Sequence, residues 1–171
     1  MRLKSVILTA SAAAERICLL AAMAALAGMV GAVMLQIVAR YGFSSPPSWT
    51  EELARYLMVW GGLLGATVAF RRGSDPVIVQ ADAFRVGWSR AVRDAALAVT
   101  TVIFLAPVLY YCFFGPDMAV ARSFLVRNAA RTSDGLGLNL AVIAASIPVT
   151  VAVIFLHLAA RLAGASRPAG S

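Results

Sequence analysis

Few side chains in this sequence could carry out chemistry. Cysteine and histidine are limited to Cys18, Cys112 and His157. Neither cysteine has a second cysteine near it in the sequence to form a redox pair, and one histidine cannot supply both axial ligands of a haem. We therefore expect no catalytic site, cofactor or metal in this chain. We expect His157, near the end of an apolar stretch, to be a polar residue at a membrane surface.

Two adjacent acidic residues, Glu51 and Glu52, follow a pair of prolines in the segment 41–49. Because proline interrupts a helix, we expect a new helix to begin here, with Ser48 as its N-cap and Glu51 as the capping-box partner. Arg55 lies four residues after Glu51 and three after Glu52, and side chains at both spacings can pair on a helix. The pattern predicts charged groups at the surface end of a helix.

Four long stretches contain no Asp, Glu, Lys or Arg, and the charged residues lie between them. These stretches are residues 17–39, 56–70, 95–116 and 135–160. A helix needs about 17–25 mostly apolar residues to cross a bilayer. The second stretch reaches that length only if its helix starts near Trp49. With 61% hydrophobic and only 13% charged residues, the composition also excludes an ordinary soluble domain.

We therefore predict an all-α integral membrane protein with four transmembrane helices. The helices form a single domain over residues 1–162, and the tail 163–171, which is rich in glycine, proline and serine, is expected to be disordered. The spans are expected at about 16–39, 50–71, 93–115 and 137–160. We expect the basic start of the chain to act as a signal anchor that is not cleaved.

A short amphipathic helix is predicted after the second span. Asp75 and Pro76 are typical of an N-cap followed by the first helical position. Apolar residues then recur at helical spacing from Val77 to Trp88, which suits a helix lying in the headgroup plane. The segment 117–134 can hold a second, less regular helix of this kind.

The basic residues predict the orientation. The first residues, the connection between spans two and three, and the C-terminal tail together hold ten Lys and Arg, whereas the opposite side holds five. Positive residues accumulate on the cytoplasmic side of membrane proteins, so both termini are expected there. Contact of these residues with anionic lipid accounts for the net charge of +7 without nucleic acid.

The spans contain glycines but almost no ionisable groups. Gly28 and Gly31 in the first span, and Gly61, Gly62 and Gly65 in the second, favour close helix packing. Ionisable residues at membrane depth normally mark the pathway of an ion or substrate. Their near absence favours a scaffold over a chain that transports alone.

The region 40–82 carries a recognisable pattern. It contains Arg40-Tyr41, then Trp49-Thr50-Glu51-Glu52-Leu53-Ala54-Arg55-Tyr56, Trp60, Gly65 and Arg71-Arg72-Gly73. This order resembles the small, DctQ-like membrane subunit of tripartite ATP-independent periplasmic (TRAP) transporters. That family has an aromatic–x–Glu-Glu-Leu–x–Arg-Tyr segment at the start of span two, a glycine within it and a basic turn after it. Asp75-Pro76 stands where the family commonly has a histidine, so no role of that histidine is carried over.

The resemblance implies a bacterial inner-membrane protein that supports a large, many-span permease subunit. In such transporters an ion gradient drives uptake of an organic acid that a periplasmic binding protein delivers. The expected partners are the large subunit, the binding protein and lipid. The candidate residues for contact with a subunit or lipid are Arg40, Trp49, Glu51, Glu52, Arg55, Tyr56, Gly65, Arg71 and Arg72.

Two other classes of function fit four spans. One is a self-contained small channel or exporter that works as an oligomer, which would need polar residues converging on a pore. The other is a membrane enzyme or redox anchor, which the scarcity of histidine, cysteine pairs and clustered carboxylates opposes.

Overall fold

The computed structural model describes residues 2–43, 45, 47–73 and 87–164. Within them, four helical segments are long and apolar enough to cross a membrane, and no strand is present, which confirms the predicted all-α membrane fold. The segments are α1 (Arg2–Phe43), α2 (Ser48–Arg72), α3 (Gly87–Phe113), and α5 (Ala141–Ala144) joined at Ala145 to α6 (Ser146–Leu162). The helix predicted from Val77 lies, as far as residue 86, outside the described residues, as does the tail from residue 165.

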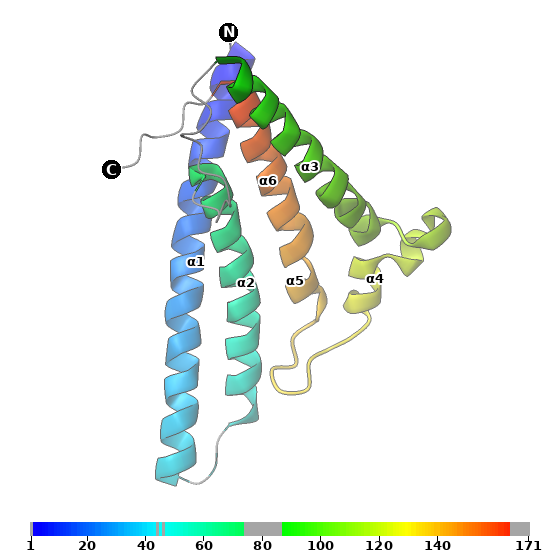
Figure 1. The fold of residues 1–171 in the computed structure, drawn as a ribbon. Coiled ribbons are helices and arrows are strands. Elements are labelled where there is room, and N and C mark those ends of the chain that lie inside the picture. Colours follow the sequence, from blue (N-terminus) through cyan, green and yellow to red (C-terminus); the bar gives the residue numbers. More distant parts are fainter. Residues whose placement is uncertain (1, 44, 46, 74–86, 165–171) are drawn as a thin grey trace.

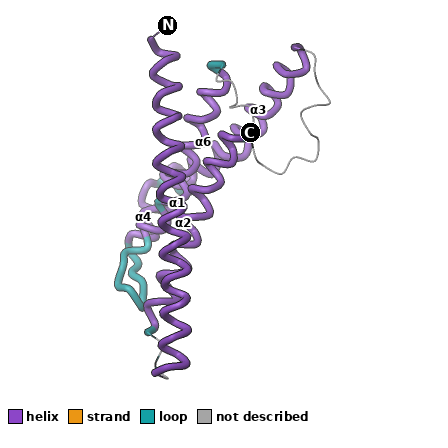
Figure 2. The backbone as a smooth tube through the Cα atoms, turned by 90° about the vertical axis from the view of Figure 1, so that its left-hand side faces the viewer, coloured by secondary structure: helices purple, strands orange, loops and turns teal. Residues whose placement is uncertain are grey.

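The helices are arranged as two antiparallel pairs. Figure 1 shows α1 and α2 side by side, with α6 next to them and α3 beyond α6. The same end of the bundle holds the starts of α1 and α3 and the end of α6; we call it the N-terminal end. Figure 2 shows from the side that α1 runs along the length of the molecule. With 42 residues, α1 is about 63 Å long at 1.5 Å per residue, roughly twice the thickness of a bilayer core.

Small residues of α1 form the contact with its neighbours. Ser11, Cys18, Ala25, Ala32 and Ala39 recur at every seventh position, and all are buried, with exposed fractions between 1% and 8%. A seven-residue repeat keeps one face of a helix against its partner along the whole contact. Small side chains on that face let two backbones approach closely, which favours helix association in lipid.

Two of the glycines belong to this contact. A Cβ atom on Gly61 would lie 3.3 Å from the Cβ of Ala25, and one on Gly28 would lie 3.1 Å from a methyl group of Leu57. By contrast, a Cβ on Gly31 or Gly62 would meet no atom within 4 Å. Close packing therefore explains Gly28 and Gly61 but not every glycine in the spans.

The connection after α3 differs from the single amphipathic helix that residues 117–134 could hold. It divides into η2 (Pro116–Met118), η3 (Val120–Arg122) and α4 (Phe124–Ala129). Asp117 and Met118 have φ values of 60° and 56°, which interrupt a right-handed helix. The Ser123 side chain then caps α4 by accepting a hydrogen bond from the Val126 N–H. Figure 1 shows that α4 folds back toward α5, which it contacts.

The close contact at Gly61 can be tested with an adjacent glycine as control. We expect Gly61→Leu to lower the free energy of unfolding by about 1–3 kcal/mol, because the larger side chain has no room beside Ala25. Gly62→Leu should cause no such loss, because its Cβ has open space. The measurement is the unfolding of each variant in detergent micelles, followed by circular dichroism. Equal effects of the two substitutions would show that Gly61 is not a packing position.

Candidate functional site

The charged start of α2 holds most of the candidate residues. Arg55 forms an ion pair with Glu51 at 3.1 Å, and both side chains are exposed. This confirms the predicted pairing four residues apart. The predicted N-cap is wrong: α2 already begins at Ser48, after Pro47, without a side-chain cap. The extended backbone at Pro47 sets the start instead, and its carbonyl accepts a hydrogen bond from the Thr50 hydroxyl at 2.7 Å.

Glu52 does not pair with Arg55 as predicted but binds a distant loop. Its Oε2 accepts hydrogen bonds from the backbone N–H groups of Gly135 and Leu136, each at 2.9 Å. Its other oxygen accepts a hydrogen bond from the Tyr56 hydroxyl, one helical turn further along α2. One carboxylate thus joins the start of α2 to the loop that precedes α5.

The loop fits this carboxylate because residue 135 is a glycine. A Cβ on Gly135 would lie 2.7 Å from the Glu52 Oε2 and 3.3 Å from the Cα of Trp49. A larger residue would force the carboxylate or the loop to move. The uncharged stretch that begins at Gly135 therefore starts as a loop, and its helix begins only at Ala141.

Three other candidates have different surroundings. Arg40 is exposed near the end of α1. The Trp49 side chain is exposed, and its Cα lies beside Gly135. Gly65 is half-buried in a groove of about 400 Å³ between α1 and α2, and a Cβ there would meet nothing within 4 Å. The nine candidates therefore do not form one site.

The remaining candidates, Arg71 and Arg72, form a second cluster at the other end of α2. Glu15 of α1 pairs with both, at 2.5 Å from the Nη1 of Arg71 and 2.8 Å from the Nε of Arg72. Arg71 also donates a hydrogen bond to the Ser11 carbonyl at 2.6 Å. These contacts attach the end of α2 to α1, so both arginines hold the chain's own helices together.

The same region contains two contacts that involve α6. Arg161 binds the Oδ1 of Asp94 on α3 through two nitrogens, at 2.7 and 3.2 Å. His157 is 2% exposed, and its Nδ1 lies 2.9 Å from the Ser11 hydroxyl. His157 is therefore buried between α6 and α1, which the sequence did not indicate. Because α1 extends to Arg2, its first turns cover this part of α6.

Sequence reasoning missed the partners in both clusters. Glu15 is the only acidic residue of α1, and two arginines end the next helix, so an antiparallel hairpin could have suggested their pairing. Asp94 and Arg161 likewise lie at the ends of neighbouring antiparallel helices. No comparable signal marks Gly135 and Leu136, because their contribution comes from backbone N–H groups.

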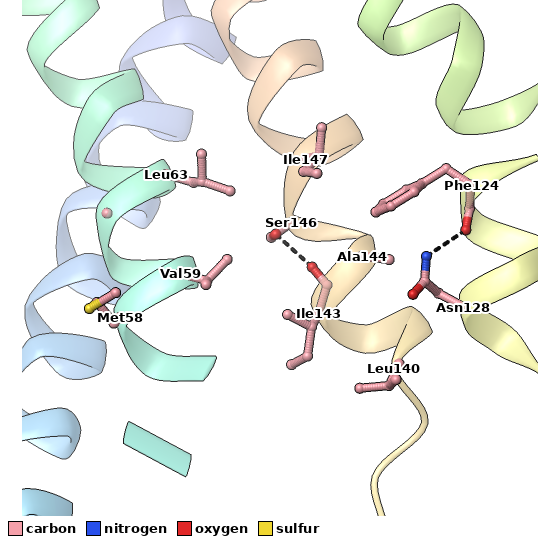
Figure 3. Close-up of a pocket in the computed structure, with 11 residues that line it drawn as sticks. Met58, Val59, Leu63, Phe124, Asn128, Leu140, Ile143, Ala144, Ser146 and Ile147 are labelled. Carbon is pink, nitrogen blue, oxygen red and sulfur yellow. Dashed lines mark hydrogen bonds between the residues drawn. The ribbon is translucent and has the colours of Figure 1, made fainter. Parts of the chain in front are cut away.

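An apolar groove of about 550 Å³ lies between α2, α4 and the α5–α6 helix. Figure 3 shows Phe124, Ile143 and Ile147 among its lining side chains. Its two polar side chains bind within their own helices: Asn128 donates to the Phe124 carbonyl and Ser146 to the Ile143 carbonyl. Among the residues that the structure describes, no charged side chain lines this groove.

Across α1, α2, α3 and α6, all four carboxylates are bound within the chain. Glu15, Glu51 and Asp94 pair with arginines, and Glu52 holds backbone N–H groups. The described residues also contain no cluster of three or more metal-ligating side chains. The contacts of these carboxylates hold helices and a loop in place.

Comparison with known proteins relates this arrangement to a family. A family model for the DctQ component of tripartite ATP-independent periplasmic transporters matches residues 29–167. The chain is 55% identical over 38 residues to a putative TRAP transporter small permease protein of Haemophilus influenzae, which is 22% of this chain and 24% of that protein.

A second similar protein is the sialic acid TRAP transporter permease protein SiaT of Haemophilus influenzae. The identity is 48% over 42 residues, or 25% of this chain and 7% of that protein. The alignments to both relatives thus span about a quarter or less of their lengths. The family model covers far more, and it confirms the resemblance that residues 40–82 suggested. The chain belongs to the DctQ family, the small membrane subunits of TRAP transporters.

Proposed function

We propose that this subunit braces the large, many-span permease subunit of its transporter. The transporter would use an ion gradient to take up an organic acid that a periplasmic binding protein delivers. The observation that carries the proposal is that the four carboxylates of the long helices are bound within the chain. None of them is left to coordinate a coupling ion, so transport is assigned to the partner.

The helix arrangement is consistent with a bracing role. The ion pairs of Glu15 and Asp94 join α1 to α2 and α3 to α6. Apolar side chains such as Leu20 on α1 and Phe104 on α3 are more than 60% exposed and offer surfaces to lipid or to another membrane subunit. We propose that the four helices act as a single membrane domain, over residues 1–162.

We place the subunit in the bacterial inner membrane with both termini in the cytoplasm. The excess of Lys and Arg on the predicted inner side supports this orientation. The shared position of the start of α1 and the end of α6 at the N-terminal end is consistent with it. In this orientation the loop that Glu52 binds, at Gly135 and Leu136, faces the periplasm. The ion pairs of Glu15 with Arg71 and Arg72 face the cytoplasm.

Purification of the tagged chain from its native membranes in mild detergent tests the bracing role. We expect a many-span protein to be recovered with it in constant stoichiometry, as identified by mass spectrometry. A homogeneous oligomer of this chain alone would contradict the proposal and favour the small channel or exporter.

Removing the contact between Glu52 and the loop at Gly135 should weaken the association of this subunit with the large permease subunit. We expect Glu52→Ala combined with Arg55→Ala to lower the amount of large subunit recovered and the rate of uptake, without changing the binding protein's affinity for substrate. Glu52→Ala alone should cause most of this effect, because the N–H groups of Gly135 and Leu136 lose the carboxylate that holds the loop to α2. Normal recovery and uptake in the double variant would remove the loop contact from the proposed function.

The mostly buried Glu15–Arg71 ion pair should contribute more to stability than the exposed Glu51–Arg55 ion pair. The Glu15 and Arg71 side chains are only 19% and 26% exposed, whereas those of Glu51 and Arg55 are 68% and 63% exposed. We expect Glu15→Ala to lower the free energy of unfolding in detergent by about 1–3 kcal/mol. Glu51→Ala, the matched control, should cost only about 0.5 kcal/mol or less. A larger loss from Glu51→Ala would contradict this ranking.

A further inference from the structure

The last turns of α6 contact α1 through a buried polar pair. His157 and Ser11 are only 2% and 1% exposed, and the Nδ1 of the imidazole ring lies 2.9 Å from the Ser11 hydroxyl. The other ring nitrogen, Nε2, has no hydrogen-bond partner among the residues that the structure describes. His157 lies five residues before the end of α6, so a small movement of that end would expose the ring.

Ser11 also brings a positive charge close to this ring. Its carbonyl accepts a hydrogen bond from Arg71 of α2 at 2.6 Å, while its hydroxyl contacts His157. Glu15 is bound to the same arginine, but its two oxygens are already occupied, one by Arg71 and the other by Arg72. Two arginines against one carboxylate leave a net positive charge, so a further positive charge at His157 is unfavourable.

The other charged groups at this end of α6 do not offset that charge. The helices in contact with α6 are α1, α2, α3 and α5, and α5 contains no titratable residue. On α3, Asp94 already pairs with Arg161, which lies one turn beyond His157 on α6. On α1, Lys4 lies at the end of α6, where a Cβ on Gly164 would be 3.3 Å from its Nζ. The nearby carboxylates are thus in ion pairs, and α1 adds a second positive charge.

The neutral and the protonated forms of the ring fit this position differently. In a neutral imidazole one nitrogen is a donor and the other an acceptor, and either form of Nδ1 can bond with the Ser11 hydroxyl. In the protonated ring both nitrogens are donors, so the Nε2–H of a charged group is left without an acceptor among the described residues. A buried charge without a partner is more destabilising than a buried neutral group. The contact therefore requires the neutral ring.

We propose that protonation of His157 separates the end of α6 from α1. The neutral ring holds the two helices together, and the proton that a histidine takes up as the pH falls removes this contact. Because Arg161 attaches α3 to the same end of α6, α3 moves away from α1 together with α6. This inference goes beyond the bracing role and does not depend on it. Only the source of the proton, the cytoplasm, follows from the proposed orientation.

The chain allows a sharp test because it contains a single histidine. Carboxylates titrate at lower pH and cysteine and lysine at higher pH, so His157 is the side chain expected to change its charge between about pH 5.5 and about pH 7.5. The full chain is purified in detergent through a tag without histidine. We expect its Tm to fall by about 2–4 °C from the higher to the lower pH. His157→Asn, which keeps a polar group for Ser11 but does not titrate, should show little of this fall.

Spin labels on α1 and α6 test whether the change occurs at this contact. The labels are attached at Val6→Cys and Leu162→Cys, both exposed positions, in a chain that also carries Cys18→Ala and Cys112→Ala. We expect double electron–electron resonance to show a population with a longer distance between the labels at the lower pH, absent at the higher pH. The same labels in the His157→Asn chain should give equal distances at both pH values.

Ser11→Ala is the matched control. It removes the hydroxyl but leaves the ring able to titrate, so the Tm should be lower at both pH values and the fall on acidification should remain. Equal Tm values and equal distances for the unsubstituted histidine at both pH values would overturn the proposal. A change on acidification that persists in His157→Asn would assign it to another group and would also overturn it. Neither result affects the bracing role, which is tested by recovery of the large subunit.

Discussion

The close contact along one face of α1 is the feature on which the other helices depend. Burial of apolar surface gives little drive for association inside a bilayer, because lipid tails are as apolar as the side chains. Helices must instead approach closely enough for dense packing. Ser11, Cys18, Ala25, Ala32 and Ala39 provide that approach over four heptads, with exposed fractions of 8% or less. Because α1 contacts both α2 and α6, it fixes the position of the second helical pair as well.

Polar contacts then determine the register that packing alone leaves open. A row of small residues could slide along a partner helix at little cost, whereas charged groups are strongly destabilised without their partners at membrane depth. Glu15 sets the level at which α2 meets α1, and Asp94 sets the level at which α3 meets α6. At the other end of the bundle, Glu52 fixes the loop before α5 against α2. The same contacts that define the fold also use the acidic groups that a transport site would require.

The sequence predicted the features that depend on local pattern. Uncharged stretches indicated the four helices, and the spacing of Glu51 and Arg55 indicated their ion pair. It did not predict contacts that depend on tertiary arrangement. The burial of His157 was not predicted, because the charged residues before Ile17 suggested that the first span started there, whereas α1 continues to Arg2 and covers the histidine. The partner of Glu52 is a backbone segment more than 80 residues away, which side-chain patterns do not reveal.

The Glu-Glu-Leu–x–Arg-Tyr segment is explained by two interleaved pairs. Glu51 with Arg55, and Glu52 with Tyr56, are each four residues apart, but adjacent residues on a helix differ in direction by about 100°. The first pair is therefore exposed, while the second turns to the Gly135 loop. Only the exposed pair is free to meet another molecule, whereas the Glu52 pair acts through the loop that it positions. A substitution in this short segment can thus disturb a partner contact or the subunit's own fold, depending on which pair it breaks.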